Sequence, residues 1–463
     1  MRPGPLLNEE KALADATETT GEVDENKIDA ENTVKLRYGL DDRPPVGETA
    51  LYSLQWLAVS LPFIVIIGTV AAGHHSADPG LRTLYLQKAT FVTGLMFLGQ
   101  ALFGHRLTLV AGPATALLLG IVGSRTTPDA VYTAVAVGGI LLALVSAAGL
   151  FQALRRLFTE RVTAAVILLV AFTLTPTIVR LLTEGSGGTV VGRLAFAAVY
   201  IMALFLAHRF LPAAARSLLI VAGMVAGAAC FFGIFGVTIA AGKQAVFAPF
   251  LTRLVSPVLD PGAIVSVLFC LLALSLNEIG SMESVVPLLR PTEMERRIRR
   301  GMTVTGIVNA AAGLLGVIGP VDFSLSPGVI AAGGCGSRFP LIPAAGLLLV
   351  ASCSPAVLGV AGAIPPAVVG GILVYTLSGQ VATGLTAAFV GRTFTFEDGL
   401  VIGLPLLAGT VTAILPPAAV AEFPTTLRPV AGNGFVVGVL VVLILDRLFH
   451  RRGITPPGSG RTR

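Results

Sequence analysis

The sequence predicts an all-α polytopic membrane protein with about fourteen transmembrane segments. Hydrophobic residues make up 54% of the chain and charged residues only 13%, with a mean hydropathy of +0.83. Apolar segments of about 20 residues, the length that crosses a bilayer as a helix, recur from Leu51 to Leu448. Two of them, Leu107–Gly120 and Asp322–Gly336, are broken by glycine, proline and polar residues. These features exclude a soluble globular protein.

The segments follow the apolar runs between loops that are rich in polar residues, glycine and proline. Their predicted bounds are Leu51–Gly73, Leu86–Phe103, Leu107–Val122, Ala130–Leu154, Val162–Leu182, Val190–Phe210, Ser217–Gly236, Ile264–Leu289, Met302–Gly319, Val321–Gly336, Leu341–Val360, Pro366–Leu385, Gly399–Leu415 and Asn433–Leu448. Because their number is even, both termini are expected on the same side of the membrane.

Basic residues are distributed unevenly between the two sides that this topology defines. With both termini in the cytoplasm, the inner loops carry the cluster from Arg290 to Arg300, and the C-terminal tail is basic as well. Cytoplasmic loops normally carry such an excess, which supports this orientation. The net charge of +6 does not indicate nucleic acid, because no aromatic–basic motif accompanies it. The expected partner is the lipid bilayer of the cell membrane, the inner membrane in a bacterium.

The two ends of the chain differ from the membrane region. Residues 1–47 are rich in Glu, Asp, Thr and Asn, and they are predicted to form a disordered cytoplasmic tail without a signal peptide. Residues 451–463 are predicted to form a second, short cytoplasmic tail. The four cysteines lie inside apolar segments without metal-ligand spacing, so neither a metal site nor a cofactor is expected.

The two broken segments have the same internal order. In the first, the extended stretch Leu107–Ala111 precedes Gly112-Pro113, and proline is favoured at the first position of a helix. In the second, the extended stretch Val321–Ser326 precedes Pro327-Gly328 and a helix of small residues. The segments begin about 215 positions apart, as an inverted repeat of half the membrane region would place them.

Short strands in these segments, meeting in the middle of the membrane, would direct the N-termini of two half-helices at one cavity. The free N–H groups and helix dipoles at such ends bind polar or anionic ligands. A kinked helix is the alternative interpretation of each segment taken alone. The matched pair favours the substrate site of a carrier.

A polar run interrupts the apolar segment beside the second broken one. Glu278 lies about midway along this segment, where a carboxylate normally faces a cavity or a partner. Asn277 and Ser281 share one face of the predicted helix, and Glu278 lies about 100° around it. Asn277 and Ser281 are therefore predicted to line the cavity together. The alternative for Glu278 is a structural role, as the partner of a nearby arginine or as a helix cap.

Two further polar residues are candidates for the site. Asp322 opens the second extended stretch and can bind a proton, a cation or a substrate amine, or it is only a cap or turn residue. Glu278 and Asp322 are therefore the candidate residues for coupling to a proton or another ion. Gln55, on the first segment, is a candidate hydrogen-bonding residue, with a helix–helix contact as the alternative.

Three stretches of the chain resemble the nucleobase–ascorbate transporter family, also called the nucleobase–cation symporters. The run from Arg300 to Gly328, with its glycines, is similar to the family from the loop after the eighth segment into the tenth. Ile364–Gly371 (IPPAVVGG) resembles the family's IPxxVxGG motif at the twelfth segment. Leu54–Ala58 (LQWLA) resembles its LQH(L/F)xA start. The resemblance covers essentially the whole membrane region in order.

This resemblance implies two inverted repeats of seven segments each, with short strands in segments 3 and 10. Segments 1–4 and 8–11 would form a core domain (48–156 and 261–362), and segments 5–7 and 12–14 a gate domain (157–260 and 363–450). Substrate would lie between the two short strands, beside the eighth segment. The candidate substrate-binding residues are Asn277, Glu278, Ser281, Ser324, Leu325, Ser326, Gly328, Val110, Ala111 and Gln55.

The chain departs from the family pattern at two places in this site. In the tenth segment, Leu325 replaces the carboxylate or amide that binds substrate, whereas Gly328 fits the signature. In the eighth, aligning Gly280 with the family glycine places Asn277 at the usual glutamate position, one residue before Glu278. Backbone amides of the tenth segment and polar side chains beside them would then have to recognise the substrate.

The leading hypothesis is a secondary active transporter that couples uptake of a uracil- or xanthine-like nucleobase to H⁺ or Na⁺. The resemblance implies elevator-type alternating access and makes a homodimer reasonable. The alternative is an anion transporter for sulfate, bicarbonate or carboxylates on the same fold, because two half-helix N-termini without a matched carboxylate suit an anion. Against this alternative, sulfate-type carriers usually have a further cytoplasmic domain. No catalytic triad or phosphate loop is present in the sequence, so an enzyme is not expected.

Overall fold

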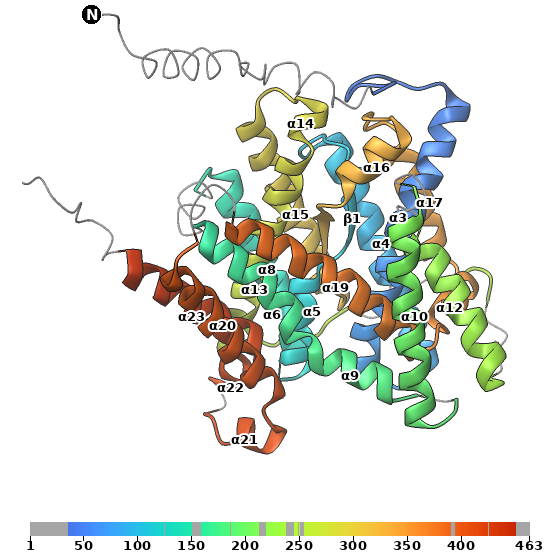
Figure 1. Cartoon of the computed structure of the whole chain (residues 1–463). Coiled ribbons are helices and arrows are strands. Elements are labelled where there is room, and N and C mark those ends of the chain that lie inside the picture. Colours follow the sequence, from blue (N-terminus) through green and yellow to red (C-terminus); the bar gives the residue numbers. More distant parts are fainter. Residues whose placement is uncertain are drawn as a thin grey trace, which may run out of the picture.

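The computed structural model describes residues 36–124, 126–150, 159–185, 187–212, 219–237, 245–248, 250, 254–389, 394–424 and 426–450 (Figure 1). The predicted tail 451–463 and residues 1–35 of the predicted N-terminal tail lie outside these ranges. The predicted segment ends at Leu154 and Ser217 do so as well.

The elements of the first half of the chain are α3 (Val46–His75), α4 (Pro79–Leu102), β1 (Val110–Pro113), α5 (Thr115–Gly123), α6 (Pro128–Ala147), α8 (Glu160–Thr173), α9 (Thr175–Thr183), α10 (Val190–Phe210) and α12 (Leu219–Phe235). Those of the second half are α13 (Pro261–Ser284), α14 (Val286–Leu289), α15 (Met294–Leu315), β2 (Pro320–Phe323), α16 (Ser326–Gly333), α17 (Leu341–Ser352), α18 (Pro355–Gly362), α19 (Pro366–Phe389), α20 (Phe396–Ile414), α21 (Pro417–Ala421), α22 (Arg428–Ala431) and α23 (Gly434–His450).

The all-α polytopic fold is confirmed. Each of the fourteen predicted segments contains one helix, two consecutive helices, or a strand followed by a helix. Within the described residues, seven helices or continuous helix pairs are long and apolar enough to cross a membrane. The pair α17 and α18 would be an eighth, bent by 89°. The remaining segments are shorter, broken or more polar, as α4 is.

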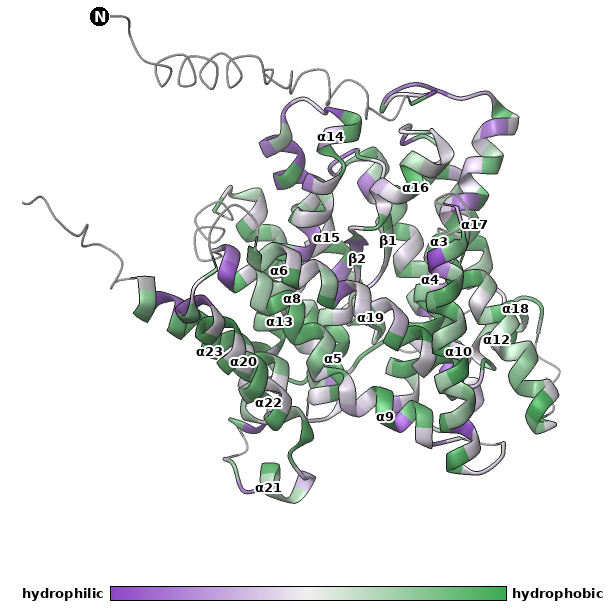
Figure 2. Cartoon of the chain, in the orientation of Figure 1, coloured by the Kyte–Doolittle hydropathy of each residue, from purple (hydrophilic) through white to green (hydrophobic). Residues whose placement is uncertain are grey.

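The helices surround a small central sheet. Figure 1 shows β1 near the centre, with α10 and α12 at one flank and α20 and α23 at the other. Figure 2 shows that hydrophobic residues cover most helices, whereas hydrophilic residues gather around α14 and the start of α15. That end carries the arginine cluster from Arg290 to Arg300.

The two strands form one antiparallel pair, as the broken segments predict. Val110 pairs with Phe323, Ala111 with Asp322, and Pro113 with Pro320 at the end of the ladder. All residues of both strands are buried. Pairing supplies hydrogen-bond partners to backbone that would otherwise be unsatisfied in the middle of a membrane, and each strand leads into a short helix, α5 or α16.

One detail of the first broken segment differs from the prediction. Gly112 and Pro113 belong to β1, and α5 begins only at Thr115, so Pro113 does not open the helix. Proline has no N–H to donate to a ladder, and it is tolerated here because it ends the strand opposite another proline, Pro320.

Gly112 is required by the close approach of an aromatic ring. A Cβ at this position would lie 2.6 Å from the ring of Phe323, which itself contacts the ring of Phe63 with centroids 4.7 Å apart. We therefore expect Gly112→Ala to lower the stability of the protein by about 1–3 kcal/mol through overpacking. Thermal unfolding in detergent checks this, and Phe323→Leu added to Gly112→Ala should restore part of the loss. An unchanged melting temperature for Gly112→Ala would contradict it.

Glycines allow a close backbone approach between α6 and α15. A Cβ on Gly306 would lie 2.4 Å from the backbone nitrogen of Ala143, and one on Gly313 would lie 2.3 Å from that of Ala136. Gly139 on α6 meets the backbone of Ala310 in the same way. The two helices therefore pack backbone against backbone, as small residues allow in membranes.

The end of the predicted N-terminal tail is ordered. Within residues 36–47, Tyr38 forms a parallel bridge with Cys335, Asp41 forms an ion pair of 2.8 Å with Arg338, and α3 covers the last positions. The prediction of disorder is wrong for this stretch, because contacts with a segment about 300 positions away hold it, and composition does not reveal such contacts.

Candidate functional site

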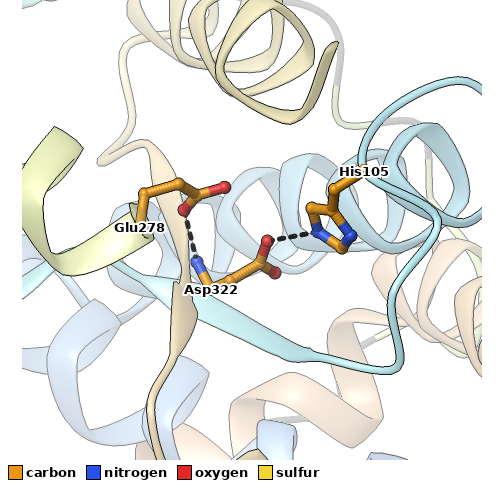
Figure 3. Close-up of side chains that lie close together, drawn as sticks. All are labelled: His105, Glu278 and Asp322. Carbon is orange, nitrogen blue, oxygen red and sulfur yellow. Dashed lines mark hydrogen bonds and ion pairs between the residues drawn. The ribbon is translucent and has the colours of Figure 1, made fainter. Parts of the chain in front are cut away.

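Four elements meet beside the central sheet. The C-terminal third of α13 contributes Glu278, β2 contributes Asp322, and the linker between α4 and β1 contributes His105 (Figure 3). Thr305 of α15 completes the group, because its hydroxyl donates a hydrogen bond to Glu278. All four side chains are buried, with relative exposures of 0–1%.

The carboxylate of Glu278 is held by neutral donors. Its Oε1 accepts hydrogen bonds from the hydroxyl of Thr305 (2.7 Å) and the amide of Gln100 (3.3 Å), and its Oε2 accepts from the backbone N–H of Asp322 (2.9 Å). The alternatives of an arginine partner or a helix cap are therefore wrong. A buried carboxylate placed among uncharged donors is available to bind a proton or a cation.

Asp322 lies inside β2, so the alternative of a cap or turn residue is also wrong. Its Oδ2 lies 2.8 Å from Nε2 of His105. Its backbone carbonyl accepts hydrogen bonds from the amide of Asn277 (3.2 Å) and the hydroxyl of Ser281 (2.8 Å). Asp322 therefore contacts α13 through its backbone and the linker before β1 through its side chain.

Asn277 and Ser281 lie on the same face of α13, as predicted, but that face contacts β2. Both side chains donate to the carbonyl of Asp322, and Ser281 also lies 3.1 Å from the hydroxyl of Ser324. They hold the strand against α13. Asn277 remains half-buried and can turn its amide oxygen toward a ligand, whereas Ser281 is fully buried.

The junction of β2 and α16 is open. Ser324 and Gly328 are exposed and Leu325 is half-buried. A Cβ added to Gly328, or to Gly280 on α13, would meet no atom within 4 Å. The first residue before α16 provides no side-chain cap to the helix, nor does the residue before α5. Free N–H groups at such helix ends attract polar or anionic ligand atoms.

Several predicted contact residues serve the framework instead. The hydroxyl of Ser326 accepts from the N–H of Val110 (3.0 Å) and donates to the carbonyl of Phe323 (2.8 Å), which links the two strands. Val110 and Ala111 are buried in the sheet. Ser326, Val110 and Ala111 thus shape the site without presenting side chains to an open space.

Gln55 contacts α16 rather than the open junction. Its amide nitrogen lies 3.4 Å from the carbonyl of Val329, and its side chain fills the space that a Cβ on Gly333 would occupy. The alternative interpretation, a helix–helix contact, describes this geometry.

Sequence reasoning missed His105. The residue lies two positions before the first broken segment, and this position close to the extended stretch was the available signal. No spacing rule connects it to Asp322, because the two lie 217 positions apart.

One ligand atom from each of His105, Glu278 and Asp322 lies within 4.8 Å of the others. Two carboxylates so close in a buried site are stabilised by a proton or a cation between them. Sequence patterns predict no metal here, since the three residues come from separate elements. The cluster can hold a cation, although both nitrogens of His105 already have hydrogen-bond partners.

A multi-pass helical membrane protein with two broken segments and paired strands at its centre has the architecture of a secondary transporter. The chain belongs to the permease family, since the family model Xan_ur_permease, described as "Permease family", matches residues 47–418. It is therefore a transporter and not an enzyme, which confirms the predicted class and the resemblance.

Relatives and solved structures agree with this class. The chain is 24% identical to the uric acid permease PucJ of Bacillus subtilis, over 72% of this chain and 75% of that protein. It is 25% identical to the nucleobase transporter PlUacP of Paenibacillus larvae, over 71% and 76% of the two chains. The transmembrane domain of the cyanobacterial bicarbonate transporter BicA has the same fold, with a TM-score of 0.56, 17% identity and coverage of 88% and 99%.

Proposed function

We propose that this permease takes up a nucleobase of the uracil or xanthine type by secondary active transport, coupled to H⁺ or Na⁺. One observation carries the proposal: Asp322, a member of the buried His105–Asp322–Glu278 cluster, lies only two residues before Ser324 at the exposed junction of β2 and α16. A polar ligand at the junction and a cation in the cluster would therefore contact the same stretch of chain. The named functions of the relatives PucJ and PlUacP favour a nucleobase.

The ligand would lie at the open junction. We propose that the side chains of Ser324 and Asn277 hydrogen-bond the polar edge of the ring at the start of α16, where Pro327 has no N–H and the N–H of Gly328 donates to the carbonyl of Leu325. Leu325 and the uncovered Gly280 and Gly328 would contact its flat faces. Because the side chain of Leu325 cannot donate or accept a hydrogen bond, recognition here depends on these neighbouring side chains more than in proteins with an acidic residue at that position.

The cation would bind between Glu278 and Asp322. Their carboxylates are buried together, and the backbone N–H of Asp322 donates directly to Glu278. A shift of β2 caused by substrate would therefore change the distance between the two acids. That link is the proposed basis of coupling.

Movement would follow the predicted division into core (48–156, 261–362) and gate (157–260, 363–450). In support, α6 packs along α15 and α4 along α17 within the proposed core, while α19 and α20 both pack on α8 within the proposed gate. We propose elevator-type sliding of the first group against the second. We also propose that both termini are cytoplasmic, because the arginine cluster from Arg290 to Arg300 then faces the cytoplasm. We further propose that the protein lies in the bacterial inner membrane and forms a homodimer.

An anion transporter remains the second candidate, favoured by the uncapped ends of α5 and α16 and by Leu325. The fold shared with the bicarbonate transporter BicA is compatible with it. The two carboxylates of the cluster close to the junction argue against it, since negative charge there would repel an anion.

Uptake into proteoliposomes separates the two functions. Purified protein is assayed with labelled xanthine, uric acid, uracil, sulfate and bicarbonate, with inward H⁺ or Na⁺ gradients. We expect saturable accumulation of at least one nucleobase, which collapses when an ionophore removes the gradient. Accumulation of an anion alone would overturn the proposal and establish the second candidate.

A further inference from the structure

The tautomer of His105 follows from its neighbours. The backbone N–H of Leu107 donates to Nδ1 of His105 at 2.8 Å, and an amide N–H can only donate. Nδ1 must therefore offer its lone pair, so the ring proton lies on Nε2. Nε2 in turn lies 2.8 Å from Oδ2 of Asp322 and donates to it. A second proton on the ring would face the N–H of Leu107, so this geometry suits the neutral imidazole.

The backbone at His105 and Arg106 is fixed by contacts with neighbouring residues. Arg106 has a φ of 56°, in the left-handed region that residues other than glycine seldom adopt. Arg297 of α15 donates to the carbonyls of both His105 (2.9 Å) and Arg106 (3.2 Å) and fixes this turn. The N–H of His105 donates to the side chain of Gln100 at 3.2 Å. Backbone strain that neighbours hold in place is often found at functional sites.

The backbone of Asp322, which accepts the hydrogen bond from His105 through its side chain, is fixed as well. The N–H of Asp322 donates to Glu278, and its carbonyl accepts from Asn277 and Ser281. With the backbone of Asp322 fixed on both sides, the donor on His105 decides where its carboxylate lies (Figure 3). The charged or titratable groups near this pair in the described chain are Glu278 and, behind the ring, Arg297.

We propose that His105 is a positioning residue, whose fixed Nε2–H holds the carboxylate of Asp322 beside Glu278 so that the two acids share one coupling cation. This inference rests on the proposed function for its transport consequence, but not for the hydrogen bond itself. It assigns a role to the linker between the second and third segments, which otherwise contributes no side chain to the cluster.

Three variants separate the two hydrogen bonds of the ring. In His105→Gln the amide nitrogen reaches about where Nε2 lies and keeps the donor to Asp322. In His105→Asn the amide oxygen takes the place of Nδ1, so the bond from Leu107 is kept and the donor to Asp322 is lost. His105→Ala loses both bonds. The glutamine and asparagine variants therefore carry the same amide group and differ only in the length of the side chain.

The experiment measures proteoliposome uptake of the transported nucleobase as a function of the coupling-cation concentration. For His105→Asn we expect the half-saturating cation concentration to rise roughly tenfold, as loss of a charge-assisted hydrogen bond predicts, with little change in the maximal rate. His105→Gln should remain within about twofold of the wild type. Equal impairment of both variants, or wild-type behaviour of His105→Asn, would overturn the proposal.

A double-mutant cycle makes the test independent of transport. Thermal unfolding of purified wild type, His105→Asn, Asp322→Asn and the double variant measures the coupling between the two side chains. We expect the histidine substitution to have little further effect once Asp322 is asparagine. Strictly additive effects would show that no bond links them. If the wild type transports no nucleobase, the proposed function fails, whereas this cycle still decides on the role of His105.

Discussion

Replacing Glu278 with glutamine should strongly reduce cation-driven accumulation while the fold and the exchange of substrate persist. The amide oxygen can still accept from the N–H of Asp322, and the amide nitrogen can donate to the hydroxyl of Thr305. The contacts with Asp322 and Thr305 are therefore kept, and only the 3.3 Å bond from the amide of Gln100 is lost. The side chain, however, no longer changes its charge, so a cation gradient cannot drive transport through it. We expect accumulation to fall roughly 10- to 100-fold, as for the loss of a charged hydrogen-bond partner.

Two assays on the same proteoliposomes separate coupling from binding. Net uptake under a cation gradient measures accumulation, and exchange of labelled against unlabelled substrate at equal concentrations measures binding and movement alone. Glu283→Gln is the matched control, because Glu283 lies on the same helix but is exposed. If Glu278→Gln accumulates substrate as the wild type does, Glu278 is not the coupling residue.

Substituting Gly306 with alanine should prevent stable packing of α15 on α6. The added Cβ would lie 2.4 Å from the backbone nitrogen of Ala143 and 2.8 Å from the carbonyl oxygen of Gly139. These are backbone atoms of a helix, so no side chain can rotate away and the helices must separate. Overpacking costs about 1–3 kcal/mol where side chains adjust, and we expect at least the upper end of that range here.

The melting temperature of purified protein in detergent measures this effect. Gly346→Ala is the matched control, since Gly346 also lies inside a helix, α17, but a Cβ there would meet no atom within 4 Å. That control should be neutral or slightly stabilising, because alanine has the higher helix propensity. A melting temperature of Gly306→Ala equal to that of the control would contradict backbone contact between the helices.

Hydropathy alone located the transmembrane segments well. The predicted segment Val190–Phe210 coincides with α10, and the predicted start at Leu341 coincides with that of α17. The bilayer requires long apolar runs whose backbone groups are all hydrogen-bonded, so the local composition determines the bounds of each segment. Gly112-Pro113 and Pro327-Gly328 marked the breaks for the same reason, although the first pair ends a strand and does not begin a helix.

The partners of the polar residues could not be predicted in the same way. Glu278 was recognisable as an intramembrane carboxylate, but nothing in the sequence pointed to Thr305 and Gln100 as its donors. Asn277 and Ser281 share one face of their helix as predicted, but that face contacts β2, and both side chains donate to the carbonyl of Asp322. Such contacts depend on how separate helices meet, and local periodicity carries no information about that.

The sequence by itself determined the class of this protein: a multi-pass helical carrier with two broken segments and paired strands at its centre. The physical basis of this class is local. A segment that crosses lipid must be long and apolar, and the positions that depart from this rule carry glycine, proline or a buried charge. Only the tertiary structure decided which of these residues contact one another. His105 and Asp322 lie 217 positions apart and meet because the antiparallel pairing of β1 and β2 brings the two broken segments side by side.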